Sequence, residues 1–193
     1  TIKKYEAFCK NNGFEIKTKS EKSFEAKYLL VASGSRRRKL GVPGEAEYDG
    51  RGVAYCSICD APLFGDKEVA VIGGGNAGLE AVIDLLPYAS KIYLLEFGDT
   101  LKGDPVTQEK IKFNPKMEII LKAKTLSILG DQNVTGLRYL DVNSNEEKNL
   151  AIQGIFIEVG ITPNSEFMKS LANINNFGEI TVDPKTHQTS CPG

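Results

Sequence analysis

Two cysteines separated by two residues, Cys56 and Cys59, are followed directly by an acidic residue, Asp60. Such a pair could hold a metal, form a structural disulfide or exchange electrons as a dithiol. A structural zinc needs four ligands, and the one histidine, His187, lies far along the chain, so no metal site is expected. A disulfide across so short a loop would constrain the unfolded chain little. A CxxC pair beside a nucleotide-binding pattern therefore favours redox chemistry, in which one thiolate attacks and the other resolves.

The acid beside the pair supports this interpretation. Asp60 can supply or accept the proton that thiol–disulfide exchange must move. If the cysteines begin a helical turn, the positive end of its dipole would favour the thiolate. The alternative is a nucleotide-binding or sensor module in which the pair is inert. Cys9 and Cys191 are isolated in the sequence, and we expect them to have no chemical role.

A glycine-rich loop with the spacing GxGxxG follows the apolar run 69–72 and opens a segment whose apolar residues recur at helical spacing. The first glycine permits a tight turn, the second lets the backbone approach a pyrophosphate, and the third lets helix and strand pack closely. Phosphate would lie at the positive end of the helix. We predict a dinucleotide site at the loop residues Gly73, Gly74, Gly75, Asn76, Ala77 and Gly78.

An acidic residue, Glu96, ends the next strand-like run, close to the roughly 20 residues past the third glycine at which a ribose-binding carboxylate is expected. A carboxylate there accepts hydrogen bonds from the adenosine ribose and repels a 2′-phosphate, which favours NADH over NADPH. An exposed acid at the end of a strand is the alternative. Lys102 is the only nearby cation that the sequence suggests could soften the preference.

The elements that position these residues follow one pattern, which occurs once in full and once in part. Residues 67–97 read as strand, glycine loop, amphipathic helix and strand, and residues 124–161 as a β-meander ending in an apolar run. Residues 2–33 read as a similar meander that feeds a buried strand over 28–32, without a glycine loop before it. The fold class is α/β, Rossmann-like with β-meander insertions. Because the first copy lacks its loop, we expect the chain to be a fragment of a longer protein.

Composition and the positions of glycine and proline indicate the domain boundaries and the kinds of partner to expect. Glycines and a proline interrupt residues 41–52 and 160–165, so the chain is expected to cross between domains there. The formal charge of −1 gives no general reason to expect nucleic acid or an anionic membrane as partner, and the basic run 35–45 is expected to be a solvated loop or linker. No apolar stretch is long enough to cross a bilayer, which favours a cytoplasmic protein.

Four segments carry a resemblance to a known family. They are GVAYCSICDAPLF, VAVIGGGNAGLEAV, GIFIEVGITPNS and GEITVD followed by TSCPG. In this order they resemble the low-molecular-weight thioredoxin reductases and the flavoprotein part of alkyl hydroperoxide reductases, over nearly the whole chain. The resemblance implies a complete NAD(P)-binding domain at 47–161 between parts of a truncated FAD-binding domain at 1–46 and 162–193.

The resemblance also implies an activity. FAD would take a hydride from the nicotinamide and pass two electrons to the CxxC pair, which exchanges with a thioredoxin-, glutaredoxin- or peroxiredoxin-like disulfide. Cys59 would face the flavin, Cys56 would attack the partner disulfide, and Asp60 would donate the proton. A swivel between the domains would use the two glycine- and proline-rich crossings, and a homodimer of the intact protein is left open.

Two departures from the family pattern bear on the cofactors. Glu96-Phe97-Gly98 stands where NADPH users carry a basic stretch, and Gly78 stands where they commonly have alanine, which again favours NADH. The family's two FAD-binding motifs fall outside these 193 residues. We therefore expect the chain by itself to bind FAD weakly or not at all and to be inactive, whereas the intact protein would need FAD.

Overall fold

The computed structural model describes residues 5–10, 13–18 and 20–191. The chain divides into two compact units, unit 1 within residues 1–36 and 161–193, and unit 2 of residues 37–160. It passes between them at 36/37 and 160/161. The predicted limits at 46/47 and 161/162 describe cofactor-binding domains and stay a prediction.

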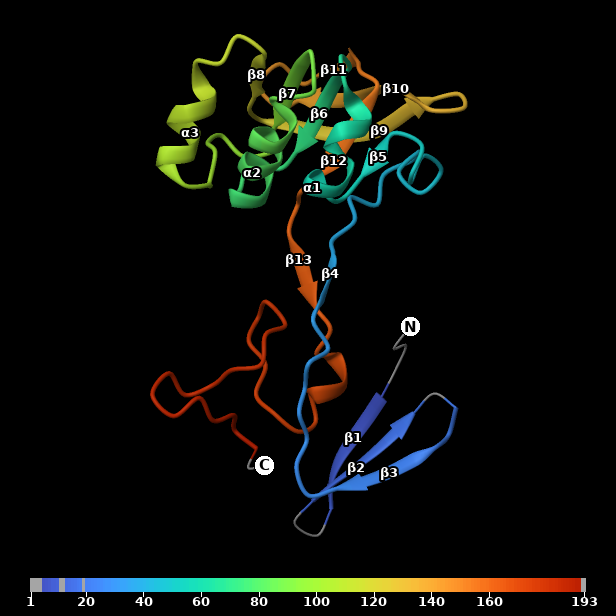
Figure 1. Ribbon diagram of the computed structural model, residues 1–193, viewed down its shortest axis with the longest axis vertical. Coiled ribbons are helices and arrows are strands. Elements are labelled where there is room, and N and C mark those ends of the chain that lie inside the picture. Colours follow the sequence, from blue (N-terminus) through green and yellow to red (C-terminus); the bar gives the residue numbers. More distant parts are fainter. Residues whose placement is uncertain (1–4, 11–12, 19, 192–193) are drawn as a thin grey trace. The chain divides into compact units, whose positions relative to one another are not determined.

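Unit 2 is built on a parallel sheet with the strand order β5-β12-β6-β7-β8, as Figure 1 shows. Its strands are β5 (Val53–Ala54), β6 (Glu68–Ile72), β7 (Lys91–Leu95), β8 (Met117–Ile120) and β12 (Gly154–Ile157). Helix α2 (Asn76–Leu85) connects β6 to β7, and α3 (Pro105–Lys112) connects β7 to β8. The predicted strand–loop–helix–strand unit is confirmed.

The two faces of this sheet are covered by different kinds of element. Val71 and Leu94 point to one face and are fully buried in a cluster with Leu79 and Val82 of α2. Alternate residues such as Ile72 and Leu95 belong to a second buried cluster. Burial on both faces explains why these strands read as continuous apolar runs.

An antiparallel meander supplies the second cluster. It comprises β9 (Ala123–Gly130), β10 (Val134–Asp141) and β11 (Glu146–Ala151), with β10 in the centre. Ile128, Val134 and Leu137 from this meander are buried in the same cluster as Ile72 of the parallel sheet. The meander predicted after residue 124 is therefore confirmed, and it covers one face of the sheet.

A short helical segment follows β5 and contains the CxxC pair. Helix α1 (Ser57–Asp60) is continued by a 3-10 turn, η1 (Ala61–Phe64). Phe64 is buried and packs edge-on against Phe156 of β12, with 4.9 Å between the ring centroids. This contact fixes the end of the segment against the sheet.

Unit 1 contains a small antiparallel sheet in the order β1-β2-β3, formed by β1 (Tyr5–Lys10), β2 (Gly13–Thr18) and β3 (Ser23–Ala26). A second pair joins β4 (Ser35–Arg37) to β13 (Ile161–Pro163), and a 3-10 turn, η2 (Glu166–Met168), follows. Beyond η2 the described residues form isolated bridges, such as that of Ile174 with Ile180.

The prediction of a buried strand over 28–32 is wrong. These residues form no strand, and Tyr28 and Leu30 are 78% and 92% exposed. An apolar run becomes a buried strand only where neighbouring strands offer hydrogen bonds and a covered face. Among the described residues of this unit, the sheets consist of β1–β3 and the β4–β13 pair, and neither includes this run.

The basic run lies at the surface, as predicted. Arg36, Arg37 and Arg38 are exposed, although they lie in or next to β4 rather than in an irregular loop. In the part of the chain that is described, no helix combines the length and apolarity needed to cross a membrane. Those residues also contain no cluster of metal-ligating side chains.

Candidate functional site

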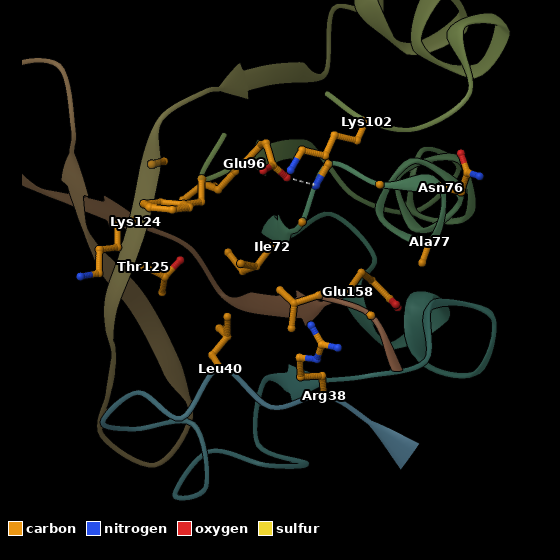
Figure 2. A pocket seen from close by; sticks show the side chains of 18 of the residues that line it. Arg38, Leu40, Ile72, Asn76, Ala77, Glu96, Lys102, Lys124, Thr125 and Glu158 are labelled. Carbon is orange, nitrogen blue, oxygen red and sulfur yellow. Dashed lines mark hydrogen bonds between the residues drawn. The ribbon is translucent and has the colours of Figure 1, made fainter. Parts of the chain in front are cut away.

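A cavity of about 810 Å³ lies where β6, β7 and β12 reach their carboxyl ends, as seen in Figure 2. The chain leaves β6 toward β7 on one side, while β12 pairs with β6 on the other. Such a reversal at the carboxyl edge is where open α/β sheets bind ligands. The structure brings most of the predicted nucleotide residues together here, with a lining that includes Gly73, Gly74, Gly75, Asn76, Ala77 and Glu96.

Gly78, the predicted third glycine, allows α2 to pack closely against the loop. Gly78 is buried in α2, and a Cβ there would collide with the backbone carbonyl oxygen of Gly73. Gly73 itself has φ +117°, and a Cβ on it would meet the backbone carbonyl of Glu158. Gly75 caps α2 and has open space around its Cα. The loop can therefore receive a ligand at the start of the helix.

Glu96 is fixed beside this loop by two backbone groups. Its Oε2 accepts from the Gly74 amide at 2.6 Å, and its Oε1 accepts from the Gly98 amide at 2.7 Å. A carboxylate has about four acceptor positions. Lone pairs therefore remain for further donors, such as the two hydroxyls of a ribose.

The prediction that Lys102 is the only nearby cation is wrong. Arg38 and Lys124 also line the cavity, and Figure 2 shows them on other sides of it. They come from segments far from the glycine loop in sequence, so proximity along the chain could not identify them. The cavity therefore combines a fixed carboxylate with three basic side chains.

A second carboxylate, Glu158, was not identified from the sequence. It lines the cavity immediately after β12, just as Glu96 follows β7, so the rule of an acid at the end of a strand would have found it. Its side chain is 2% exposed and pairs with Arg37, 2.7 Å from Oε2 to Nη1. Burial raises the pKa of the Glu158 carboxyl, and the Arg37 guanidinium opposes that rise.

The cysteine pair forms a disulfide in the structure, with 5.4 Å between the Cα atoms of Cys56 and Cys59. Cys56 caps α1 and is partly buried, whereas Cys59 is exposed. The condition that the pair begins a helical turn is met. Since α1 has only four residues, however, its dipole is small. Asp60 follows directly and is partly buried.

A polar contact joins the segment that carries the disulfide to α2. The Ser57 hydroxyl donates to Asp84 Oδ2 at 2.7 Å and so joins α1 to α2. Asp84 lies near the end of α2, whereas the glycine loop lies at its start. Nothing in the residue spacing indicated this contact. It places the disulfide and the glycine loop near opposite ends of one helix.

The packing of the glycines predicts opposite effects for two alanine substitutions. Gly78→Ala should lower the thermal unfolding midpoint by several degrees, although Gly→Ala inside a helix ordinarily stabilises by about 1 kcal/mol. Gly75→Ala should leave the midpoint within about 2 °C, because its Cβ meets open space. Thermal scans monitored by circular dichroism measure both. A stabilised Gly78→Ala would contradict the close approach of α2 to the loop.

The buried carboxyl predicts a pH effect. Because its pKa lies above 4.5 in the folded chain, the stability that Glu158 contributes is complete below pH 4.5 and is lost as the pH rises through the folded-state pKa. Glu158→Gln mimics the protonated form, so its melting temperature should rise relative to the parent chain between about pH 4.5 and 7. Glu146→Gln, at an exposed acid on β11 that is not among the charges acting on Glu158, should show no such trend. A deficit that grew with pH would mean that the Arg37 pair outweighs desolvation.

Known proteins that resemble this chain include redox enzymes whose family name contains both a pyridine nucleotide and a disulfide. The family model described as pyridine nucleotide-disulphide oxidoreductase matches residues 2–193. The alkyl hydroperoxide reductase (F subunit) of Pseudomonas putida is 46% identical over 180 residues, which cover 93% of this chain and 34% of that protein. A protein named NADH dehydrogenase in Bacillus subtilis is 42% identical over 184 residues, or 95% of this chain and 36% of that one.

Solved structures show the same fold. Thioredoxin reductase from Lactococcus lactis superposes with a TM-score of 0.86 at 30% identity, covering 97% of this chain and 62% of that one. Thioredoxin reductase from T. acidophilum has a TM-score of 0.85 at 35% identity, with coverages of 98% and 62%. The predicted Rossmann-like α/β fold is confirmed. The chain spans about a third of the length of the curated relatives it matches, and it belongs to the pyridine nucleotide-disulphide oxidoreductase family.

Proposed function

We propose that this chain forms the nucleotide- and disulfide-carrying part of an NADH-dependent disulfide reductase of the thioredoxin reductase type. One observation carries the proposal. A single compact unit holds both a glycine-lined cavity with a fixed carboxylate and a disulfide in which one residue, Cys59, is exposed. Relatives named alkyl hydroperoxide reductase and thioredoxin reductase support it. The partner proposed is a thioredoxin-, glutaredoxin- or peroxiredoxin-like protein disulfide.

The cavity suits a dinucleotide. Its volume of about 810 Å³ lies within the range of small-molecule sites. The unobstructed Gly75 at the start of α2 would receive the pyrophosphate, where backbone amides and the helix dipole favour negative charge. Glu96 would accept from the ribose hydroxyls, and its charge would repel the 2′-phosphate of NADPH.

FAD is assigned to no residue of this chain. Among the described residues of unit 1, the elements are short strands and a 3-10 turn, without the strand–glycine loop–helix unit that could cradle its pyrophosphate. For the intact protein we propose FAD, which carries two electrons between a nicotinamide and a disulfide. The placing of the glycine loop and the disulfide near opposite ends of α2 supports the need for such a carrier.

The sulfur chemistry of the chain itself is an exchange of disulfides. Once the Cys56–Cys59 bond has been reduced with two electrons from NADH, the Cys56 thiolate would attack a partner disulfide and form a mixed disulfide, releasing one partner thiolate. Cys59 would then attack Cys56, which restores the internal disulfide and releases the second partner thiolate. Asp60, next to Cys59 in the chain, would hold or supply the proton for the leaving sulfur.

Glu96→Arg is expected to shift the nucleotide preference. The change replaces a repelling carboxylate with a guanidinium that can pair with a phosphate, so the affinity ratio of NADPH to NADH should rise by about tenfold or more. Calorimetric titration of the 193-residue chain with each nucleotide measures this ratio. Asp99→Arg makes the same charge change at an exposed residue outside the cavity lining and should leave the ratio nearly unchanged. An unaltered ratio in Glu96→Arg would show that the acid does not contact the ribose.

Cys59→Ser is expected to trap a partner. Without a resolving thiol, the Cys56 thiolate of the reduced chain should accumulate a mixed disulfide with an oxidised thioredoxin, visible on a non-reducing gel. Cys56→Ser should accumulate little, and the double variant measures the background from Cys9 and Cys191.

Three results would count against this scheme. A larger adduct with Cys56→Ser would reverse the roles of the two cysteines. Background levels in both single variants, with iodoacetamide rates typical of an ordinary thiol, would favour the inert sensor module instead. Failure of the chain to bind NADH in calorimetry would remove the nucleotide site from the proposal.

A further inference from the structure

A hydrogen bond between α1 and α2 lies next to the cysteine that is proposed to attack a partner. Ser57 follows Cys56 directly and is buried, and its hydroxyl donates to Asp84 Oδ2 at 2.7 Å. Asp84 itself is partly exposed on α2. A hydroxyl bound to a carboxylate makes one of the stronger hydrogen bonds found in proteins. The bond therefore connects the segment of the disulfide to a helix of ten residues.

Helix α1 depends on support from outside itself. It has four residues, and the Asp60 amide donates to the Cys56 carbonyl at 3.1 Å. A first helical turn fixes several residues for one such bond, so it is unfavourable in isolation. Cys56, at the start of the turn, makes no side-chain capping bond to a described residue. The turn is therefore maintained by the disulfide across it and by contacts with the rest of unit 2.

The residues on either side of the first cysteine are held, whereas those that follow are exposed. Tyr55 donates from its hydroxyl to the buried Glu45 at 2.9 Å. Ser57 is held by its bond to α2, which packs beside α1 (Figure 1). By contrast, Ile58 is 82% exposed, and Cys59 is exposed as well. The second half of the turn is thus the part that can unwind when the disulfide opens.

Reduction changes how completely the bond between Ser57 and Asp84 is made. In the oxidised chain the disulfide keeps the turn wound, so the serine hydroxyl stays in place. In the reduced chain no covalent bond closes the turn, and the hydrogen bond forms only in the fraction of molecules that remain wound. The bond therefore stabilises the oxidised chain more than the reduced chain. An interaction that favours one of two states shifts the equilibrium toward that state.

We propose that Ser57 and Asp84 are positioning residues that keep the thiols of Cys56 and Cys59 close together after reduction and so lower the reduction potential of the pair. The proposal rests on the redox role that the proposed function gives to these cysteines. A lower potential makes the dithiol a stronger reductant toward the disulfide of a partner. The hydrogen bond thus acts on the exchange without contacting the reacting sulfur atoms.

Equilibration of the 193-residue chain with glutathione at pH 7 tests this role. Two glutathione thiols supply two electrons and two protons, the Cys56–Cys59 bond breaks into two thiols, and one glutathione disulfide forms. Alkylation and mass spectrometry of the peptide that contains both cysteines measure the reduced fraction. Ser57→Ala should raise the equilibrium constant for reduction by about fivefold, which corresponds to a potential higher by about 20 mV.

Substitutions of the acceptor separate the hydrogen bond from the charge. Asp84→Ala should raise the constant by a similar factor, and combining it with Ser57→Ala should add little, because both remove the same contact. Asp84→Asn keeps an acceptor for the hydroxyl while removing the charge, so it should retain most of the parent potential. A full shift in Asp84→Asn together with a parent-like Ser57→Ala would assign the effect to charge and overturn the proposal.

Tyr93→Phe is the matched control. The Tyr93 hydroxyl donates to Glu68 Oε2 at 3.0 Å, which is also a bond from a hydroxyl to a carboxylate, but it joins β7 to β6 rather than α1 to α2. This substitution should leave the potential unchanged. A shift as large as that of Ser57→Ala would show that any lost hydroxyl contact moves the potential, and the specific role of Ser57 would be lost.

The outcomes separate this proposal from the proposed function. A parent-like potential in Ser57→Ala, with unfolding midpoints lowered equally in the oxidised and reduced chains, would show a purely structural contact. That result would overturn the proposal and leave the exchange with a partner, which Cys59→Ser tests, unaffected. A raised potential in Ser57→Ala without a partner adduct in Cys59→Ser would instead support the positioning of the two thiols and remove their exchange function.

Discussion

The close approach of three backbone segments at the carboxyl edge of the parallel sheet is the constraint on which the site depends. Gly78, in the first turn of α2, lies against the carbonyl of Gly73. Gly73, at the end of β6, in turn lies against the backbone of Glu158, just after β12. Neither contact has room for a Cβ. Because this packing fixes the direction of α2, it also determines where backbone amides and the helix dipole can meet a phosphate. The cavity is thus defined mainly by backbone, and side chains give it selectivity.

Two carboxylates at the ends of neighbouring strands show how similar sequence positions acquire different roles. Glu96 lines the cavity, accepts hydrogen bonds from two backbone amides and keeps further acceptor positions. Glu158 is more deeply buried and depends on one guanidinium at the surface of the unit, that of Arg37. The first arrangement stabilises a charged group beside a prospective ribose. The second retains a desolvated acid in the wall of a cavity that is proposed to receive a pyrophosphate.

The disulfide is held by a separate set of contacts. Helix α1 is joined to the far part of α2 by Ser57 and Asp84, and the following turn is anchored by Phe64 against the sheet. These contacts fix the polypeptide around Cys56 while Cys59 stays exposed. Cys56, which is proposed to attack a partner, is only partly buried, and its neighbour in the disulfide is exposed. The backbone of the glycine loop is instead closely packed. Helix α2 connects these two environments at its opposite ends.

The sequence by itself determined the parallel strands, the glycine loop, the strand-end Glu96 and the cysteine pair, because each depends on local periodicity or on fixed short spacing. It failed for the apolar run at 28–32, whose burial would require neighbouring strands that the described residues do not supply. Only the tertiary structure brought Thr125, Lys124 and Arg38 to the cavity. These residues come from segments distant in sequence. The packing of the meander on the sheet places Lys124 and Thr125, and a hydrogen bond from the Arg38 amide to the Gly160 carbonyl holds Arg38 beside the chain that follows β12. No local pattern encodes either contact.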